Sequence, residues 1–232
     1  FFPADDRFAG LIKVYGAFAA GYLMRPIGGM LFGHLGDRFG RKRALELSIL
    51  MMALPTFLVG CLPTHAQIGT SAALLLIVLR LAQGVSVGGE LIGSMSYIVE
   101  TAPPGKRGLY GSWTLFTAIG GILVGSIAVT LLRGVLDADE LAAWGWRVPF
   151  LCGIAIAGVG IWLRLSLPES EAFERASAED DSDRSPVVRA FAEAGGRIAQ
   201  LSALLALFGT GFYMLFVWMP TYYTDILQPP IP

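Results

Sequence analysis

Charged residues are scarce in this chain, and their scarcity excludes an ordinary water-soluble domain. Only 15% of the 232 residues are Asp, Glu, Lys or Arg, whereas soluble domains hold about 25%. Hydrophobic residues make up 54% of the chain, and its mean hydropathy is +0.61. The alternative is a large soluble α-helical protein, but a chain of this size cannot bury several helices that are apolar on every side.

Cysteine and histidine are also rare, at two residues each. Cys61 and Cys152 stand alone within apolar segments, so we interpret them as small hydrophobic residues rather than as a disulfide or metal pair. The sequence contains no G-x-x-x-x-G-K-[ST] loop, no H-E-x-x-H and no Cys/His cluster. We therefore expect no metal, no cofactor and no enzymatic activity, and the net charge of −1 gives no basic footprint for nucleic acid.

Long apolar stretches are what the chain does contain. A helix needs about 20 predominantly apolar residues to cross a bilayer core, and small residues let such helices pack closely. Several of the 29 glycines are four residues apart, as in Gly84/Gly88 and Gly121/Gly125. We predict an all-α membrane protein with six transmembrane helices, near residues 9–33, 44–63, 73–98, 109–132, 147–166 and 200–226.

The distribution of basic residues indicates an orientation, since short loops rich in Lys and Arg stay in the cytoplasm. The loops near 34–43 and 103–108 are basic, whereas 63–70 holds no Lys or Arg and 133–147 has an acidic centre. Alternation of the predicted helices then places the long polar connection at 168–198 inside as well. The charge bias and the number of helices agree on this topology.

The first basic loop, residues 33–43, reads GHLGDRFGRKR. Two helices joined by so short a loop need glycine for the tight reversal, and we expect Gly36 and Gly40 to supply it. Asp37 can pair with Arg41 and sit at a neighbouring helix N-terminus, where a carboxylate is favoured. A cluster that only fixes orientation is the alternative, and it explains the arginines but neither the aspartate nor the spaced glycines.

A second motif lies inside the third apolar stretch, where residues 80–90 read RLAQGVSVGGE. Arg80, Gln83 and Glu90 fall on one face of a helix, within roughly 80° of each other. A charge at membrane depth costs on the order of 3 kcal/mol or more, so it should face a cavity or a partner. Arg80 and Glu90 are about 15 Å apart along the axis, so each needs another helix. The alternative for Glu90 is a structural pair that fixes helix packing.

These two motifs resemble the major facilitator superfamily. The loop is similar to that family's signature G-x-L-x-D-R-x-G-R-K, and residues 80–90 resemble its fourth-helix motif, whose arginine is linked to proton coupling. In that family the loop locks the two halves on the cytoplasmic side and is released as the carrier turns inward. The resemblance implies a proton-coupling or cavity face at Arg80, Gln83 and Glu90. It also implies a conformational switch at Gly33, Asp37, Arg38, Gly40, Arg41 and Lys42.

Other stretches resemble one branch of the superfamily, the metabolite:proton symporters, which carry α-ketoglutarate, citrate, shikimate, and proline or betaine. The helix at 111–121 lacks the G-P pair of drug-proton antiporters, and residues 211–223 are more similar to the proline/betaine symporter than to the α-ketoglutarate one. The stretches that carry the branch resemblance are RPIGG at 25–29, ETAPPGKRG at 100–108, WGWRVPF at 144–150 and LPES at 167–170.

The resemblance also implies a domain organisation. Aligned with the twelve-helix plan of the superfamily, the six predicted segments correspond to helices two to seven. We expect a five-helix bundle of the N-terminal half over 1–167, a cytoplasmic central linker over 168–198, and the first helix of the C-terminal half over 199–232. The helix-like piece at 187–194 either lies on the membrane surface as an amphipathic helix or belongs to a solvated loop.

Two further residues are candidates for substrate binding. Arg25 is an intramembrane cation whose guanidinium can fork onto a carboxylate; the alternative is a side chain that snorkels to the cytoplasmic surface or pairs with a neighbouring helix. Tyr213 can contribute to a cation–π site for a quaternary ammonium. Trp218, Tyr222 and Tyr223 could join it, although residues of the membrane-interface belt are the alternative for these three.

The sequence thus predicts a secondary active transporter of a bacterial plasma membrane that couples proton entry to uptake of a small organic metabolite. The metabolite would be an osmolyte such as proline or betaine, or a carboxylate such as α-ketoglutarate or citrate. Its partners would be substrate, protons, lipid and the remaining helices of the same full-length chain. An exporter or an uncoupled facilitator of the same superfamily is the first alternative. An intramembrane enzyme or a receptor is the second, and neither a catalytic motif nor a soluble output domain supports it.

Overall fold

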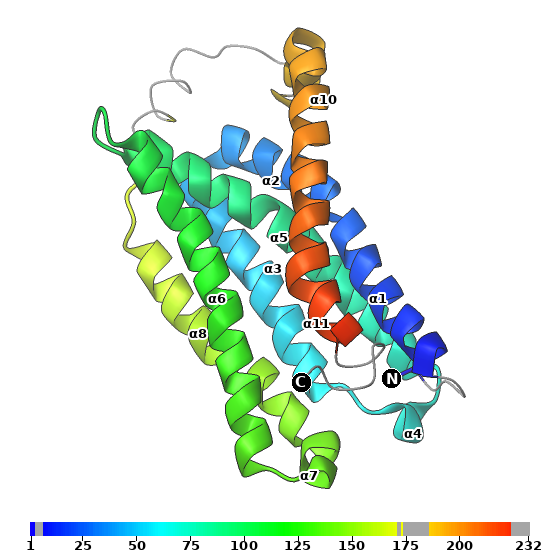
Figure 1. The fold of residues 1–232 in the computed structure, drawn as a ribbon. Coiled ribbons are helices and arrows are strands. Elements are labelled where there is room, and N and C mark those ends of the chain that lie inside the picture. The colour runs from blue at the N-terminus through cyan, green and yellow to red at the C-terminus, as the bar shows by residue number, and fades with distance from the viewer. Residues whose placement is uncertain (3–6, 171–172, 174–185, 224–232) are drawn as a thin grey trace. The chain divides into compact units, whose positions relative to one another are not determined.

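The computed structural model describes residues 1–2, 7–170, 173 and 186–223, and these residues are almost entirely helical, with no strand among them (Figure 1). Residues 1–182 and 183–232 form two compact units. The first unit holds α1 (Arg7–Leu23), α2 (Arg25–Phe39), α3 (Arg41–Cys61), α4 (His65–Ile68), α5 (Ser71–Thr101), α6 (Arg107–Val135), α7 (Ala138–Ala143), the 3₁₀ turn η1 (Gly145–Arg147) and α8 (Val148–Leu165). The second holds α10 (Pro186–Tyr213), the π-helical turn η2 (Met214–Trp218) and α11 (Met219–Thr221).

Five helical segments are long and apolar enough to cross a membrane, and they confirm five of the six predicted spans. The sixth predicted span, residues 9–33, is divided between α1 and α2, which meet at Met24. Pro26 explains the division, because it lacks the N–H that would continue the helical ladder to the Tyr22 carbonyl. The five spans found in the described residues are Arg41–Cys61, Ser71–Thr101, Arg107–Val135, Gly145–Leu165 and Ala190–Thr221.

Helix α5 is central to the first unit. It packs against α1, α2 and α3, and α3 in turn packs against α8 (Figure 1). Glycines bring α5 into backbone contact with its neighbours: a Cβ atom on Gly84 would overlap the carbonyl of Gly21, and one on Gly88 would overlap that of Arg25. The predicted packing role of Gly84 and Gly88 is therefore confirmed. At Gly121 and Gly125, a Cβ atom would meet no described atom within 4 Å beyond the adjoining residues of its own helix.

The second unit is one long helix with two irregularities. Backbone angles at Ala194 depart from helical values (φ −131°, ψ 18°), so α10 is kinked there. Residues 187–194, expected to be a short helix, form the first turns of α10 before this kink. Near the other end the helix widens at η2, and Pro220 lies in the short α11 that follows. The last three residues of the predicted span, 224–226, lie outside the described residues.

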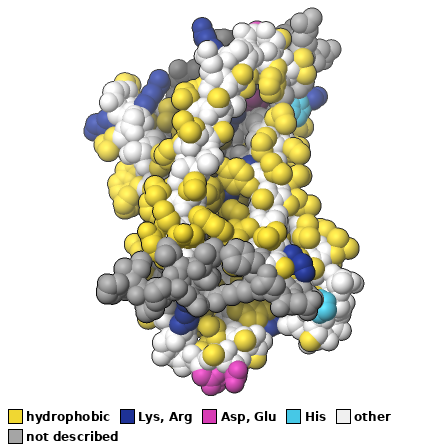
Figure 2. All heavy atoms as spheres, turned by 45° about the vertical axis from the view of Figure 1, so that its right-hand side comes forward, with side chains coloured by type: hydrophobic (Ala, Val, Ile, Leu, Met, Phe, Trp, Pro, Cys, Tyr) yellow, Lys and Arg dark blue, Asp and Glu magenta, His cyan; other side chains and the backbone are white. Residues whose placement is uncertain are grey.

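Much of the described surface is apolar. In Arg107–Val135 and Ala190–Thr221, the 18-residue stretch that qualifies each helix as a membrane span holds no buried residue. Hydrophobic side chains form large patches on the described surface visible in Figure 2. Exposed apolar area on this scale calls for lipid or for further protein. Together with the five apolar spans, it defines a multi-pass integral membrane protein.

Candidate transport site

An ion pair lies inside the first unit and includes one of the predicted site residues. Glu90 of α5 pairs with Arg164, which lies one residue before the end of α8. A second hydrogen bond joins Arg164 Nη1 to Glu90 Oε2 at 3.2 Å, so the guanidinium and the carboxylate meet in a bidentate arrangement. The expectation that Glu90 requires a partner from another helix is confirmed, and that partner is Arg164.

Two buried serines extend this ion pair into the interface between α3 and α5. The Ser48 hydroxyl of α3 contacts Glu90 Oε2 and also lies 2.9 Å from the Leu45 carbonyl. Ser86 of α5 donates to the Ser48 carbonyl at 2.6 Å. Both serines are 1% exposed or less. Each of these buried hydroxyls has a hydrogen-bond partner, which offsets the cost of removing it from water.

Arg80 and Gln83 form a second polar cluster along the same interface. Arg80 Nη1 donates to Gln83 Oε1 at 3.1 Å, and Gln83 Nε2 donates to the Thr56 hydroxyl of α3 at 2.8 Å. Arg80 was expected to need a partner from another helix. Among the described residues its hydrogen bond is to Gln83 of the same helix, which in turn reaches α3, so a direct partner from another helix stays a prediction. The three predicted coupling residues thus belong to two clusters on one seam.

The two predicted substrate residues lie in different units. The guanidinium of Arg25 stacks over the ring of Tyr22, with its central carbon 4.3 Å from the ring centroid. Tyr213 ends α10 and packs edge-on against Phe212, with ring centroids 5.6 Å apart. The contact of Arg25 with Tyr22 is a cation–π interaction, whereas the ring contact of Tyr213 with Phe212 is between two aromatic side chains.

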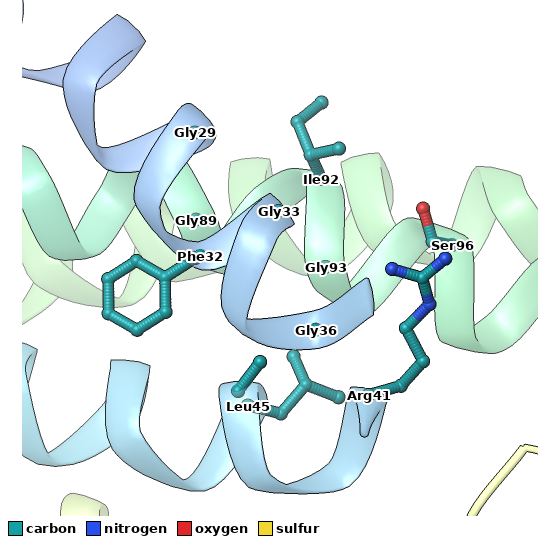
Figure 3. Close-up of a pocket in the computed structure, with 11 residues that line it drawn as sticks. Gly29, Phe32, Gly33, Gly36, Arg41, Leu45, Gly89, Ile92, Gly93 and Ser96 are labelled. Carbon is teal, nitrogen blue, oxygen red and sulfur yellow. The ribbon is translucent and has the colours of Figure 1, made fainter. Parts of the chain in front are cut away.

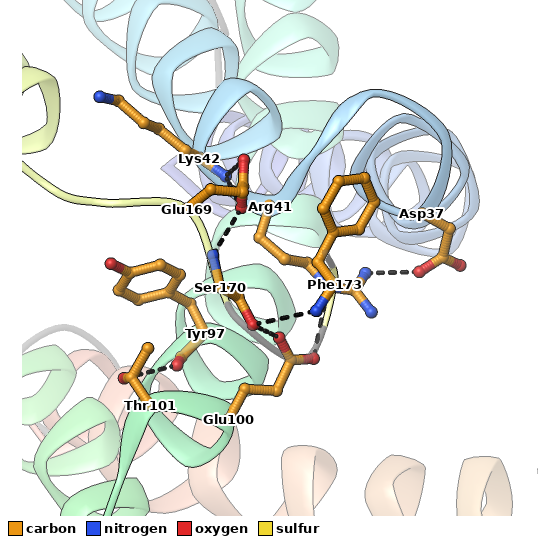
Figure 4. A network of polar contacts seen from close by, with 9 residues as sticks. All are labelled: Asp37, Arg41, Lys42, Tyr97, Glu100, Thr101, Glu169, Ser170 and Phe173. Carbon is orange, nitrogen blue, oxygen red and sulfur yellow. Dashed lines mark hydrogen bonds and ion pairs between the residues drawn. The ribbon is translucent and has the colours of Figure 1, made fainter. Parts of the chain in front are cut away.

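The predicted switch loop is the centre of a polar network at the end of α2 (Figure 4). Arg41 binds Asp37 at 2.5 Å, which confirms the predicted pair, and its Nε lies 3.4 Å from Glu100 of α5. Glu100 also accepts a hydrogen bond from the Ser170 hydroxyl at 2.7 Å. One guanidinium therefore connects the loop to α5 and to the segment that follows α8.

The reversal between α2 and α3 is made by one residue, Gly40, with φ 108°. Gly36, which we expected to share this task, stays within α2 and is buried, since α2 continues to Phe39. A Cβ on Gly36 would lie 3.2 Å from Arg41 Nη1, so its small size makes room for the arginine. The interpretation of Gly36 as a turn residue is thus corrected.

The carboxylate expected at the N-terminus of α3 belongs to Glu169 and not to Asp37. The backbone N–H of Lys42 donates to both carboxylate oxygens of Glu169, at 3.2 and 3.3 Å. The N-cap residue of α3 is Gly40, which has no side chain to cap the helix itself. Lys42 Nζ also donates to the Leu165 carbonyl at 2.9 Å. A carboxylate at a helix N-terminus is favoured by the helix dipole, so α3 is capped from a distant part of the chain.

A small pocket opens beside this loop, between α2, α3 and α5 (Figure 3). Its walls are mostly glycine and apolar side chains, among them Gly33 and Phe32, and Arg41 points toward Ser96 at one end. Arg38, the remaining predicted switch residue, is exposed and lies near the Phe39 ring, 5.9 Å from its centroid. The pocket belongs to the glycine packing of α2 against α5.

Several residues of these networks were not singled out from the sequence, among them Ser48, Glu100, Arg164 and Glu169. Arg164 carried a usable signal, since it is a lone cation at the end of the apolar stretch 147–166 and a charge at that depth requires a partner. Glu100 and Glu169 occur in stretches noted for resemblance only. Ser48 has no such signal, because a serine in an apolar helix is common.

Gly40→Ala should destabilise the junction between α2 and α3. The new Cβ would overlap the Glu169 carboxylate, which displaces the cap of α3, and alanine is strained at φ 108°. We expect a loss of about 1–3 kcal/mol, measured as a lower melting temperature in detergent. Gly105→Ala is the matched control, because Gly105 has φ 79° and, beyond its chain neighbours, no described atom lies within 4 Å of where its Cβ would be. Equal losses for the two variants would show that backbone strain alone acts at Gly40.

The geometry defines the class: a polytopic helical membrane protein with paired charges inside its bundle and a basic, glycine-turned loop at one end. Residues 12–192 match the family described as sugar (and other) transporter. The chain therefore belongs to the sugar (and other) transporter family, which lies within the major facilitator superfamily and consists of transporters rather than enzymes.

Two curated relatives narrow the resemblance. The α-ketoglutarate permease of Escherichia coli K12 is 44% identical over 170 residues, covering 73% of this chain and 39% of the relative. The proline/betaine transporter of Salmonella typhimurium LT2 is 34% identical over 238 residues, covering 98% of this chain and 47% of the relative. The chain spans about half the length of the curated relatives it matches. Both names agree with the branch predicted from the sequence.

A solved structure supports the fold. The xylose transporter XylE from E. coli, in a partially occluded inward-open conformation, aligns with a TM-score of 0.67 at 23% identity, covering 75% of this chain and 42% of that one. The helical bundle of this chain is therefore a part of the major facilitator fold.

Proposed function

We propose that this chain belongs to a secondary active transporter that couples proton entry to uptake of a small organic metabolite across a bacterial inner membrane. The observation that carries the proposal is the titratable carboxylate of Glu90, which lies in a membrane-spanning helix and is paired with Arg164. Intramembrane acidic residues mark proton or substrate pathways in membrane proteins. The names of the relatives, which are transporters of proline and betaine or of α-ketoglutarate, supply the substrate class.

The residues fall into three proposed roles. Glu90 carries the coupled proton, and Arg80 and Gln83 form a second polar cluster on the same face of α5. Arg25 and Tyr213 contact the substrate, the first through a carboxylate and the second through a quaternary ammonium. The switch comprises Gly33, Asp37, Arg38, Gly40, Arg41 and Lys42, and it opens when the two halves rock about the substrate.

The proposed organisation follows the superfamily plan. Residues 1–167 form five helices of the N-terminal half, 168–198 the cytoplasmic linker, and 199–232 the first helix of the C-terminal half. The network of Asp37, Arg41 and Glu100 supports a cytoplasmic position for the α2–α3 loop, since it lies at the same end of the unit as the basic 103–108 connection.

Uptake by the transporter that carries this chain, produced from its complete gene, tests the function. The protein is reconstituted in liposomes with an imposed inward proton gradient, and internal pH is followed while α-ketoglutarate, citrate, proline and glycine betaine are offered in turn. We expect internal acidification that depends on one of these substrates, because symport moves proton and substrate together. Empty liposomes and a protonophore are the controls.

Two outcomes would contradict this proposal. Substrate entry without proton movement would indicate an uncoupled facilitator. Silence across the panel from folded, inserted protein would favour an exporter or a different substrate. Substrate-dependent acidification would establish symport and name the substrate class together.

A further inference from the structure

Arg164 has a position that no role proposed so far explains. Its side chain is 16% exposed and pairs with Glu90 of α5, and Nη1 also donates to the Leu45 carbonyl of α3. One guanidinium at the end of α8 thus contacts two other helices at once. Among the described residues, it is the charged group in contact with Glu90.

The other elements around Glu90 offer neutral groups. Helix α3 presents the Ser48 hydroxyl and the Leu45 carbonyl, and α2 places the Phe32 ring against the adjacent Gly89. The nearby acidic residue of α3, Glu46, makes no ion pair among the described residues. A change in the charge of Glu90 is therefore felt chiefly by Arg164.

The residues that follow Arg164 are attached at several points to α3 and α5. The Leu165 carbonyl accepts from Lys42 Nζ at 2.9 Å, and the Pro168 carbonyl accepts from the Tyr97 hydroxyl at 2.8 Å. Glu169 then caps α3, and Ser170 binds Glu100. Residues 164–170, which we name the α8 tether, thus run from the intramembrane carboxylate to the α2–α3 loop. Figure 4 shows the last two of them, Glu169 and Ser170, beside that loop.

We propose that Arg164 is a positioning residue that links proton occupancy of Glu90 to the α8 tether, and through the tether to the cap of α3. The inference rests on the proposed function of Glu90. When a proton binds one carboxylate oxygen, the negative charge that holds the guanidinium is removed. Arg164 then keeps the Leu45 carbonyl but loses its ionic partner, which loosens the end of α8 from α5 and favours release of Glu169 and Ser170.

A purely structural role makes a different prediction. Buried ion pairs contribute little net stability compared with apolar packing, whereas removing one partner leaves an uncompensated charge. A structural pair would change yield and melting temperature but would give the tether no response to pH. The decisive measurement is therefore the opening of the tether as a function of pH.

Ser170 provides the reporter, since it is fully buried in this structure. In the transporter produced from its complete gene, every native cysteine, Cys61 and Cys152 among them, is replaced by alanine and Ser170→Cys is introduced. The maleimide labelling rate is measured in nanodiscs over a pH series and divided by the rate for denatured protein, which removes the intrinsic pH dependence of the thiol. Uptake of substrate is measured in parallel on each variant.

We expect the parent reporter to label at least about tenfold faster at low pH than at high pH, corresponding to about 1.4 kcal/mol of opening. Glu90→Gln and Arg164→Gln should each label fast at every pH, and the double variant should label no faster than either. Glu46→Gln is the matched control and should keep the pH response of the parent.

The possible outcomes distinguish a failure of this inference from a failure of the proposed role of Glu90 in proton coupling. If Glu90→Gln abolishes proton-driven uptake while Arg164→Gln keeps slow, pH-responsive labelling, the link is overturned and the proton site stands. If Glu90→Gln leaves proton-driven uptake intact, the proposed proton-carrying role of Glu90 fails, and this inference fails with it, while symport itself stands. Should Arg164→Gln fold poorly because Glu90 is left unpaired, the double variant removes both charges. Labelling that still responds to pH in that variant overturns the inference, and fast, pH-independent labelling supports it.

Discussion

Gly84→Ala is expected to remove most of the yield of folded transporter. The new methyl group would overlap the carbonyl of Gly21, which belongs to the backbone of α1 and cannot move aside as a flexible side chain can. The helices would have to separate along the contact of α5 with α1. Overpacking costs about 1–3 kcal/mol where side chains can adjust, and we expect about 3 kcal/mol or more here.

Size-exclusion chromatography and thermal unfolding in detergent measure this loss. Gly28→Ala should behave in the same way, because its Cβ would overlap the Val85 carbonyl. Gly125→Ala is the matched control, with no described atom within 4 Å, and there alanine gains up to about 1 kcal/mol of helix propensity over glycine. A melting temperature for Gly84→Ala equal to that of Gly125→Ala would show that α1 and α5 do not approach so closely.

Glu90→Gln is expected to abolish proton-driven accumulation of substrate. Glutamine retains the size of glutamate and an oxygen that can accept from Ser48, but it neither ionises nor carries a proton. With one proton per substrate, each pH unit across the membrane supports about tenfold accumulation. In the variant the ratio of internal to external substrate should approach one, whatever the gradient.

Exchange of labelled for unlabelled substrate measures whether the variant still binds and turns over. We expect exchange to persist, since it requires no net proton movement, and to lose its dependence on pH. Glu46→Gln, on the neighbouring helix α3, should leave both accumulation and exchange unchanged. Accumulation by Glu90→Gln with the pH dependence of the parent would exclude Glu90 from the coupling.

Local sequence was sufficient for most of the helices. Apolar length predicted α3, α5, α6 and α8 as single spans, because a bilayer imposes a minimum length that composition reveals directly. The span at 9–33 was predicted as one helix despite Pro26, since hydropathy counts apolar residues and takes no account of the N–H that proline lacks. Gly36 was misplaced for a related reason: a glycine in a loop motif can serve a turn or a close contact, and sequence does not separate the two.

In the candidate site, too, contacts between residues close in sequence could be predicted, whereas contacts between distant residues could not. The pair of Asp37 and Arg41 could be predicted, because four residues on one turn of a helix bring the side chains together. The need of Glu90 for a partner was equally clear from the cost of a charge at membrane depth. Its partner was not, because Arg164 is 74 residues away and only the packing of α8 against α3 brings it there.

The sequence by itself determined a membrane protein of apolar helices, the family to which it belongs, and a polar face on one of those helices. These follow from composition, periodicity and short motifs, all of which act over a few turns. The tertiary structure decided which charges meet: Arg164 with Glu90, Glu100 with Arg41, and Glu169 with the N-terminus of α3. Such pairs depend on how closely α5 approaches its neighbours, and that approach is set by backbone contacts at glycines whose partners lie far along the chain.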